Sequence, residues 1–310
     1  MQPMITLLLI QKISELFLIM MVGFALVRLK LLKPENSKVL SVLTVYCLAP
    51  CAIISGYQVE LAQDVVVGFF CAMGVSAVLM VGQMLLVKLI AISLHLTKLE
   101  QACSIYSNCL NLIIPLVGFC LGDEWIIYSL AYMTVMTTLI WTHGYSLIKG
   151  ETAFNIRKIL TNINLIAIVL GFIMFVLNIR LAGPLQVFAA DMGSFLGPAC
   201  MLTAGMIVGN MSLKEVFARK RVWLIVAIRL LVIPLFATLA LKYSGIAALI
   251  PNGQSILLVT LLAIVTPSAS NTVQLAVLFD KDANHASAIN VVSTMMCVVT
   301  MPLWVALYLA

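Results

Sequence analysis

The stretch Thr266-Pro267-Ser268-Ala269-Ser270-Asn271-Thr272 lies inside an apolar segment that runs from about Ile256 to Phe279. A proline and this many polar side chains are unusual there. In lipid, each backbone group freed by a break is costly unless protein or a watery cavity satisfies it. The break therefore indicates either a binding site or a simple kink whose freed carbonyls are satisfied by serine or threonine.

The composition indicates that the whole chain, and not only this segment, lies in a membrane. Of its 310 residues, 63% are hydrophobic and only 10% are charged, against roughly 25% charged in a soluble domain. A bilayer-spanning helix needs about 20 mostly apolar residues. We therefore predict an all-α polytopic membrane protein with ten transmembrane helices, at about 6–28, 37–57, 65–87, 99–120, 124–147, 160–179, 185–209, 222–242, 254–279 and 286–308.

The basic residues predict the orientation, because cytoplasmic loops are enriched in lysine and arginine. The loops that follow odd-numbered helices hold 14 basic residues, whereas the opposite side holds only Arg180 and Lys242. Both termini are thus expected to be extracytoplasmic, in a multi-pass protein of a bacterial-type inner or plasma membrane. Topology accounts for the net charge of +6, so no nucleic-acid partner is expected.

The two halves of the chain resemble each other. Leu48-Ala49-Pro50 is echoed by Leu196-Gly197-Pro198, and Asn108 before Pro115 by Pro267 before Asn271. These matches predict two five-helix repeats, at 1–148 and 159–310, joined by a cytoplasmic loop at 149–158. Because five is odd, the second repeat would be inverted relative to the first. Chance similarity between short apolar strings is the alternative.

Inverted repeats with helices interrupted at matching positions are typical of secondary transporters, whose site lies near the bilayer midplane. The sequence also resembles a known family. Pro267-Ser268-Ala269-Ser270-Asn271-Thr272, followed by Leu275-Ala276, Phe279-Asp280 and Thr300-Met301-Pro302-Leu303, is similar to the auxin efflux carrier family, which includes bacterial malate and malonate permeases and the plant PIN carriers. The resemblance extends over the whole chain.

The resemblance implies two inverted five-helix repeats, as in bile acid sodium symporters, with helices 4 and 9 broken where they cross. Asn108 with Pro115, and Pro267 with Asn271, would mark the two breaks. Helix 4 departs from the family pattern because Leu110 and Ile113 replace two glycines. The first break is therefore expected to be bulkier or less unwound, which leaves the identity of the substrate open.

Broken helices expose N–H groups at one half-helix and carbonyls at the other, so the crossing can hold an anion and, separately, a cation. A carboxylate is the natural ligand. Alternatively, the amide side chains only satisfy freed backbone groups. The expected substrate-binding residues are Asn108, Asn111, Pro115, Pro267, Ser268, Ser270, Asn271, Thr272 and Arg229.

Arg229 is a special case, because a charge inside the membrane is a functional-site hypothesis by default. It would attract an organic anion, or it would extend to the interface as long basic side chains do. Lys12 and Glu15 are three residues apart in helix 1 and are expected to pair on one helix face, as a structural pair near the outer leaflet; a proton relay is the alternative.

The function expected is that of a secondary carrier moving a small organic anion, such as malate, malonate or an auxin-like acid, by alternating access. A non-transporting sensor or a channel on the same fold is the alternative. An enzyme is not expected, because no span carries a paired-carboxylate, HExxH or Asp-rich metal motif, and a primary pump is not expected, because the chain has no Walker A motif. No cofactor is expected. Coupling to Na⁺, coupling to H⁺ and facilitated diffusion stay open, as does a homodimer; the anion and the lipid bilayer are the expected partners.

Overall fold

The computed structural model describes residues 2–150 and 161–310, so of the predicted connecting loop only Lys149 and Gly150 are described. The described chain is helical, with one isolated antiparallel bridge between Ser107 and Ser268. The α-helices are α1 (Gln2–Arg28), α2 (Asn36–Leu43), α3 (Ala49–Gly56), α4 (Gln63–Leu94), α5 (Lys98–Ile105), α6 (Cys109–Cys120), α7 (Ile126–Leu139), α8 (Tyr145–Lys149), α10 (Ile163–Val176), α11 (Gly183–Ser194), α12 (Leu196–Asn210), α13 (Leu213–Ala218), α14 (Lys220–Ala227), α15 (Ile233–Tyr243), α16 (Gly253–Ile264), α17 (Ser270–Leu278) and α18 (Ala283–Leu309).

Three π-helical turns join some of these into longer helices. They are η1 (Thr44–Leu48) between α2 and α3, η3 (Ile140–Gly144) between α7 and α8, and η4 (Ile228–Val232) between α14 and α15. Two 3₁₀ turns, η2 (Asp123–Trp125) and η5 (Ile246–Ala248), lie in connections. Such π-helical turns are rare and frequently occur at functional sites.

Seven of the described helices are long and apolar enough to cross a bilayer, given that about 20 residues are required. Three further apolar helices, within 111–120, 163–176 and 253–264, are shorter. Two of these are halves of broken helices, at the predicted spans 4 and 9, and the third lies in predicted span 6. The all-helical membrane fold is confirmed, whereas the count of ten spans and the inverted repeats stay predictions. The seven long helices are 7–28, 36–56, 63–94, 123–149, 183–210, 220–243 and 283–309.

The outer surface of the bundle is apolar. Large hydrophobic side chains such as Leu18, Val78, Leu89 and Leu303 are more than 60% exposed. So much exposed apolar area on helices of this length indicates contact with lipid rather than water. The protein is therefore an integral, multi-pass membrane protein.

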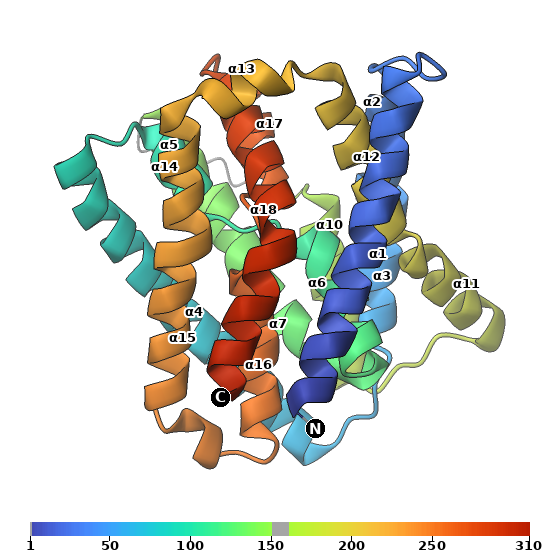
Figure 1. Cartoon of the computed structure of the whole chain (residues 1–310). Helices are drawn as coiled ribbons and strands as arrows, with labels where there is room; N and C mark the ends of the chain where they lie inside the picture. The colour runs from blue at the N-terminus through green and yellow to red at the C-terminus, as the bar shows by residue number, and fades with distance from the viewer. Residues whose placement is uncertain (1, 151–160) are drawn as a thin grey trace.

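The two termini lie at the same end of the molecule, which is the lower end in Figure 1. The turn between α1 and α2 and the short helix α13 lie at the opposite, upper end, which we call the basic end because its connections carry Lys30, Lys33, Lys214 and Arg219. The interrupted helices α5–α6 and α16–α17 occupy the middle of the bundle, with α1, α4, α12 and α15 around them.

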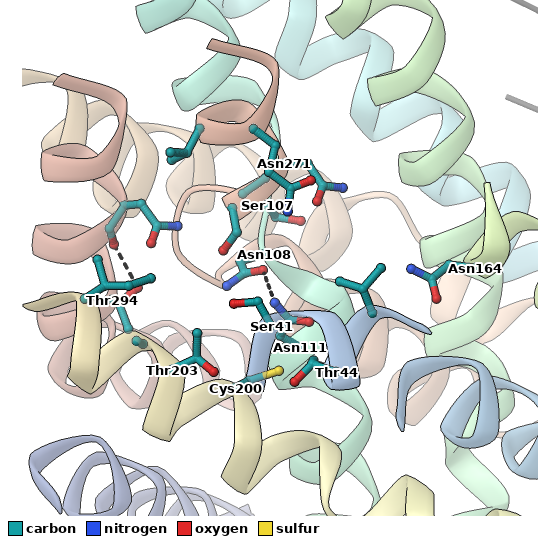
Figure 2. Close-up of a pocket in the computed structure, with 18 of the residues that line it drawn as sticks. Ser41, Thr44, Ser107, Asn108, Asn111, Asn164, Cys200, Thr203, Asn271 and Thr294 are labelled. Atoms are coloured by element: carbon teal, nitrogen blue, oxygen red, sulfur yellow. Dashed lines mark hydrogen bonds between the residues drawn. The ribbon is translucent and has the colours of Figure 1, made fainter. Parts of the chain in front are cut away.

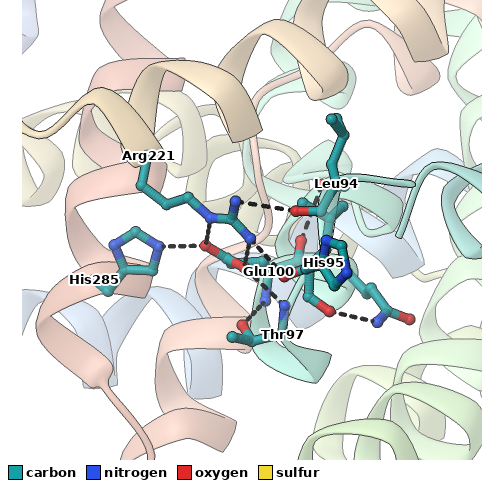
Figure 3. A network of polar contacts seen from close by, with 9 residues as sticks. Leu94, His95, Thr97, Glu100, Arg221 and His285 are labelled. Atoms are coloured by element: carbon teal, nitrogen blue, oxygen red, sulfur yellow. Dashed lines mark hydrogen bonds and ion pairs between the residues drawn. The ribbon is translucent and has the colours of Figure 1, made fainter. Parts of the chain in front are cut away.

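A network around Glu100 ties three helices together at the basic end (Figure 3). Thr97 and Glu100 form a reciprocal capping box that starts α5. Glu100 is only 2% exposed, and its carboxylate accepts hydrogen bonds from Arg221 at 2.7 and 2.9 Å and from His285 Nε2 at 3.1 Å. Because Arg221 belongs to α14 and His285 to α18, the network fixes the start of α5 against both helices.

The predicted Lys12–Glu15 pair is confirmed. Lys12 Nζ lies 2.9 Å from Glu15 Oε1, on one face of α1. Lys12 also lies over the ring of Phe119, 5.0 Å from its centroid. The Lys12 side chain thereby connects α1 to the end of α6.

Gln83 of α4 stands out in the interior, because it is fully buried and neither of its amide atoms has a hydrogen-bond partner among the described residues. A buried polar group without a partner costs about 1–3 kcal/mol. We therefore expect Gln83→Leu, which has similar volume, to raise the free energy of unfolding by about 1 kcal/mol or more. Thermal melting in detergent measures this change. A lower melting temperature would show that Gln83 has a partner, such as an internal water.

Candidate functional site

Two helices are interrupted near the centre of the bundle, and the two interruptions contact each other. α5 ends at Ile105 and α6 begins at Cys109, while α16 ends at Ile264 and α17 begins at Ser270. We call residues 106–108 and 265–269 together the crossover. Its two strands pair antiparallel: the N–H of Asn108 donates to the carbonyl of Pro267 at 2.8 Å, and the N–H of Ala269 donates to that of Tyr106 at 2.9 Å.

The second break follows from its sequence. Pro267 has no N–H to continue a helix, and the residue before a proline disfavours the α conformation. The freed groups are satisfied by side chains: Ser293 Oγ accepts from the N–H of Ser268 at 3.1 Å, and Asn290 Nδ2 donates to its carbonyl at 2.6 Å. Two side chains of α18 thus satisfy the backbone of Ser268 at the interruption between α16 and α17.

The first break has no proline, since Pro115 lies inside α6 and packs against Gly197 of α12. Here the chain is turned out of the helix at Tyr106, whose φ and ψ are −87° and 131°. The carbonyl of Cys103 accepts from Ser268 Oγ at 2.9 Å. Leu110 and Ile113 lie past the break, within α6, and the helix is unwound ahead of them in spite of the missing glycines.

A cavity of about 300 Å³ lies between the crossover and the basic end of the bundle. That volume is at the small end of the usual range for ligand pockets, roughly 300–1,000 Å³. Figure 2 shows amide and hydroxyl side chains from several helices turned towards it. Its polar lining comprises Ser41, Thr44, Ser107, Asn108, Asn111, Thr137, Asn162, Asn164, Thr203, Ser270, Asn271, Gln274, Ser287, Asn290 and Thr294, with apolar lining from Val45, Met136, Trp141, Met201, Ile207 and Val273.

The cavity receives four of the nine residues expected to bind substrate: Asn108, Asn111, Ser270 and Asn271. Asn111 Nδ2 donates to Asn108 Oδ1 at 2.9 Å, so these two amides form a pair in the cavity lining (Figure 2). The Asn271 side chain forms no hydrogen bond with another described residue, and its amide is available to a ligand.

The other five expected residues do not line the cavity. Pro115 and Pro267 shape the two helices, and Ser268 bonds the backbone of α5. Thr272 Oγ1 donates to the carbonyl of Ala269 at 2.6 Å. Arg229 is fully buried, and its guanidinium bonds backbone carbonyls around the crossover. The hydroxyls of Ser268 and Thr272 thus both donate to backbone carbonyls.

The cavity meets the N-terminal ends of two half-helices. Asn108 and Ala269, the residues that precede α6 and α17, both line it, and neither forms a side-chain cap hydrogen bond with its helix. The first N–H groups of a helix have no partner within the helix and carry a partial positive charge. The arrangement therefore favours an anion, as helix N-termini do generally.

Sequence reasoning missed lining residues that lie outside the two broken helices: Asn162 and Asn164 at the start of α10, Thr203 of α12 and Asn290 of α18. Single polar residues in apolar segments are a weak signal, and only the tertiary fold brings these together. Two of the π-helical turns also contribute, through Thr44 in η1 and Trp141 in η3.

No lysine, arginine, aspartate or glutamate is among the described residues that line the cavity. Neutral amides and hydroxyls can orient a ligand through donors and acceptors, and the apolar wall accommodates a hydrocarbon part. A ligand with a single negative charge matches this lining better than one with several, because each further buried charge would need a partner.

A sequence model for a family described as membrane transport protein matches residues 8–155 and 151–305. Together the two matches take in the crossover, the cavity and nearly all of the chain. Among curated proteins, none matches the sequence.

Proposed function

Because the chain belongs to the membrane transport protein family, as its resemblance to the auxin efflux carriers predicts, we propose that it is a secondary carrier that moves a small organic anion by alternating access. The observation that carries the proposal is the cavity at the crossover, with two uncapped helix N-termini and the amides of Asn108, Asn111 and Asn271. A carboxylate bound there would accept hydrogen bonds from these donors.

The position of the cavity supports a conformation open towards the basic end. Ile207 and Gln274, on the side away from the crossover, are exposed. With the basic loops placed in the cytoplasm, this conformation faces inward and both termini are extracytoplasmic. Transport would then require the half-helices of the crossover to move against α1, α3 and α12, so that the same donors become accessible from the other side.

Binding is tested first, by thermal melting of the purified protein with malate, malonate, lactate or indole-3-acetate, each in sodium or choline chloride. A ligand that binds only the folded state stabilises it by about 2.7 kcal/mol at 100 times its Kd. We expect a rise with at least one acid, and a larger one for a monocarboxylate. If none of the acids raises the melting temperature, the proposed substrate class is wrong.

Transport is tested with proteoliposomes and the acid that binds best. A carrier that alternates between two faces is expected to take up labelled substrate faster when unlabelled substrate is present inside, because the return step is then loaded. A channel shows no such acceleration, and a sensor shows no uptake. Either of these results would contradict alternating access while leaving the membrane fold unaffected.

A further inference from the structure

Arg229 is a charged residue in the interior of the membrane domain. Its side chain is fully buried in η4, within the long helix 220–243. Across the described residues 2–150 and 161–310, no carboxylate forms an ion pair with it. A buried charge of this kind is costly and is retained where it has a function and a compensating set of contacts.

The contacts of Arg229 are backbone carbonyls. Nε donates to Thr266 at 3.2 Å, and Nη1 donates to Ser104 at 3.3 Å and to Ile105 at 3.2 Å. Nη2 donates to Thr266 at 2.9 Å and to Ile264. A guanidinium has five N–H donors, and these five hydrogen bonds use all of them.

The four carbonyls belong to the ends of two half-helices. Ser104 and Ile105 are the last residues of α5, Ile264 is the last residue of α16, and Thr266 follows it in the crossover. The last carbonyls of a helix have no partner within the helix. Since the carbonyls of Ala102 and Cys103 are used by Tyr106 and Ser268, Arg229 completes the set at the end of α5.

The charge balance around the crossover follows from this geometry. Each helix C-terminus carries roughly −0.5 of an elementary charge, so the converging ends of α5 and α16 carry about −1 together. Left bare, they would repel an anion in the adjacent cavity. In broken transporter helices such ends and unwound carbonyls coordinate Na⁺. Here a guanidinium fills that place.

We propose that the guanidinium of Arg229 serves as a permanent cation of the crossover. It occupies the carbonyl cage, which is the set of carbonyls of Ser104, Ile105, Ile264 and Thr266, where a metal ion could sit. Anion binding in the cavity therefore requires no Na⁺. The statement about anion binding rests on the proposed function, whereas the placement of Arg229 among the carbonyls does not. Arg229 is thus a positioning residue that holds α5, α16 and the helix 220–243 together and neutralises the two C-termini. It does not touch the transported anion.

The test is chemical rescue of Arg229→Ala, with Arg180→Ala as the matched control because Arg180 is exposed. Without ligand, Arg229→Ala is expected to melt at lower temperature than the wild type. Guanidinium or methylguanidinium at low millimolar concentration should restore the melting temperature of this variant alone, whereas tetramethylammonium, which has no N–H donor, should not. If neither guanidinium compound stabilises the folded variant, the proposal that the Arg229 guanidinium stabilises these carbonyls is wrong.

The second measurement is carboxylate binding in sodium and in choline chloride. Wild-type affinity is expected to be the same in both, and Arg229→Ala to bind about tenfold more weakly until guanidinium is added. A wild-type requirement for Na⁺ would contradict the inference, and this holds even if Arg229→Ala cannot be purified. If guanidinium restores stability but no carboxylate binds the wild type, the cage stands and the proposed function fails.

Discussion

Replacing Asn271 with alanine is expected to weaken carboxylate binding about 10- to 100-fold and to reduce transport accordingly, because a hydrogen bond to a charged group contributes about 1.5–3 kcal/mol. Asn271 is the second residue of α17 and lines the cavity. It lies beside the uncapped N–H groups of that helix, where its amide can donate to the same bound anion.

Stability should change little in this variant. The Asn271 side chain bonds no other described residue, so its removal leaves no buried partner unsatisfied, and such substitutions are usually within about 0.5 kcal/mol. Asn108→Ala is the instructive contrast, since it also breaks the 2.9 Å hydrogen bond from Asn111 and is expected to lower both binding and stability.

Ligand-induced melting shifts and uptake into proteoliposomes measure these effects, with Asn210→Ala as the matched control at the exposed end of α12. Wild-type binding and uptake by Asn271→Ala would contradict a role for the α17 N-terminus in recognition. A large loss of stability would instead place Asn271 in the support of the crossover.

The break at Thr266–Thr272 could be predicted from the sequence because its signal is local. A proline surrounded by hydroxyl and amide groups in an apolar segment has few physical interpretations, and the helix is interrupted there in the structure. The first break carries a weaker signal, since Pro115 lies within α6 rather than in the unwound residues. It depends on contacts from Ser268 and Arg229, which lie far away in the sequence.

The roles of individual site residues were less predictable for the same reason. Sequence alone shows that Arg229 is a charge inside a span, but backbone carbonyls have no sequence signature, so its partners could not be identified. The converse holds for Asn162, Asn164 and Asn290, whose segments show no motif. Their place in the cavity depends on how α10 and α18 pack against the crossover.

Gly205→Ala is expected to give the largest loss of stability of any single methyl addition proposed here, because α1 and α12 approach each other through their backbones. A Cβ on Gly205 would overlap the carbonyl oxygen of Met20 and lie 2.8 Å from the N of Phe24. Gly23 of α1 makes the reciprocal approach to the backbone of Leu202. Small residues that permit such close packing are typical of helix interfaces in membranes.

Side-chain rotation cannot relieve a clash with backbone, so the two helices must separate along their shared interface. Overpacking costs about 1–3 kcal/mol and occasionally more, and we expect the upper part of that range here. Separation also moves Thr203, which lies two residues before Gly205 and lines the cavity. Carboxylate binding should therefore weaken together with stability.

Gly74→Ala is the matched control, since a Cβ there would meet no atom within 4 Å and Gly74 is exposed on α4. Alanine is the better helix former by about 1 kcal/mol, so this variant should melt at or above the wild-type temperature in detergent. The difference in melting temperature between the two variants therefore reports the crowding of the α1–α12 interface, separately from the general effect of replacing glycine with alanine. Equal melting of Gly205→Ala and the wild type would mean that α1 and α12 do not pack this closely, and that the wall of the cavity formed by Thr203 is not fixed by α1.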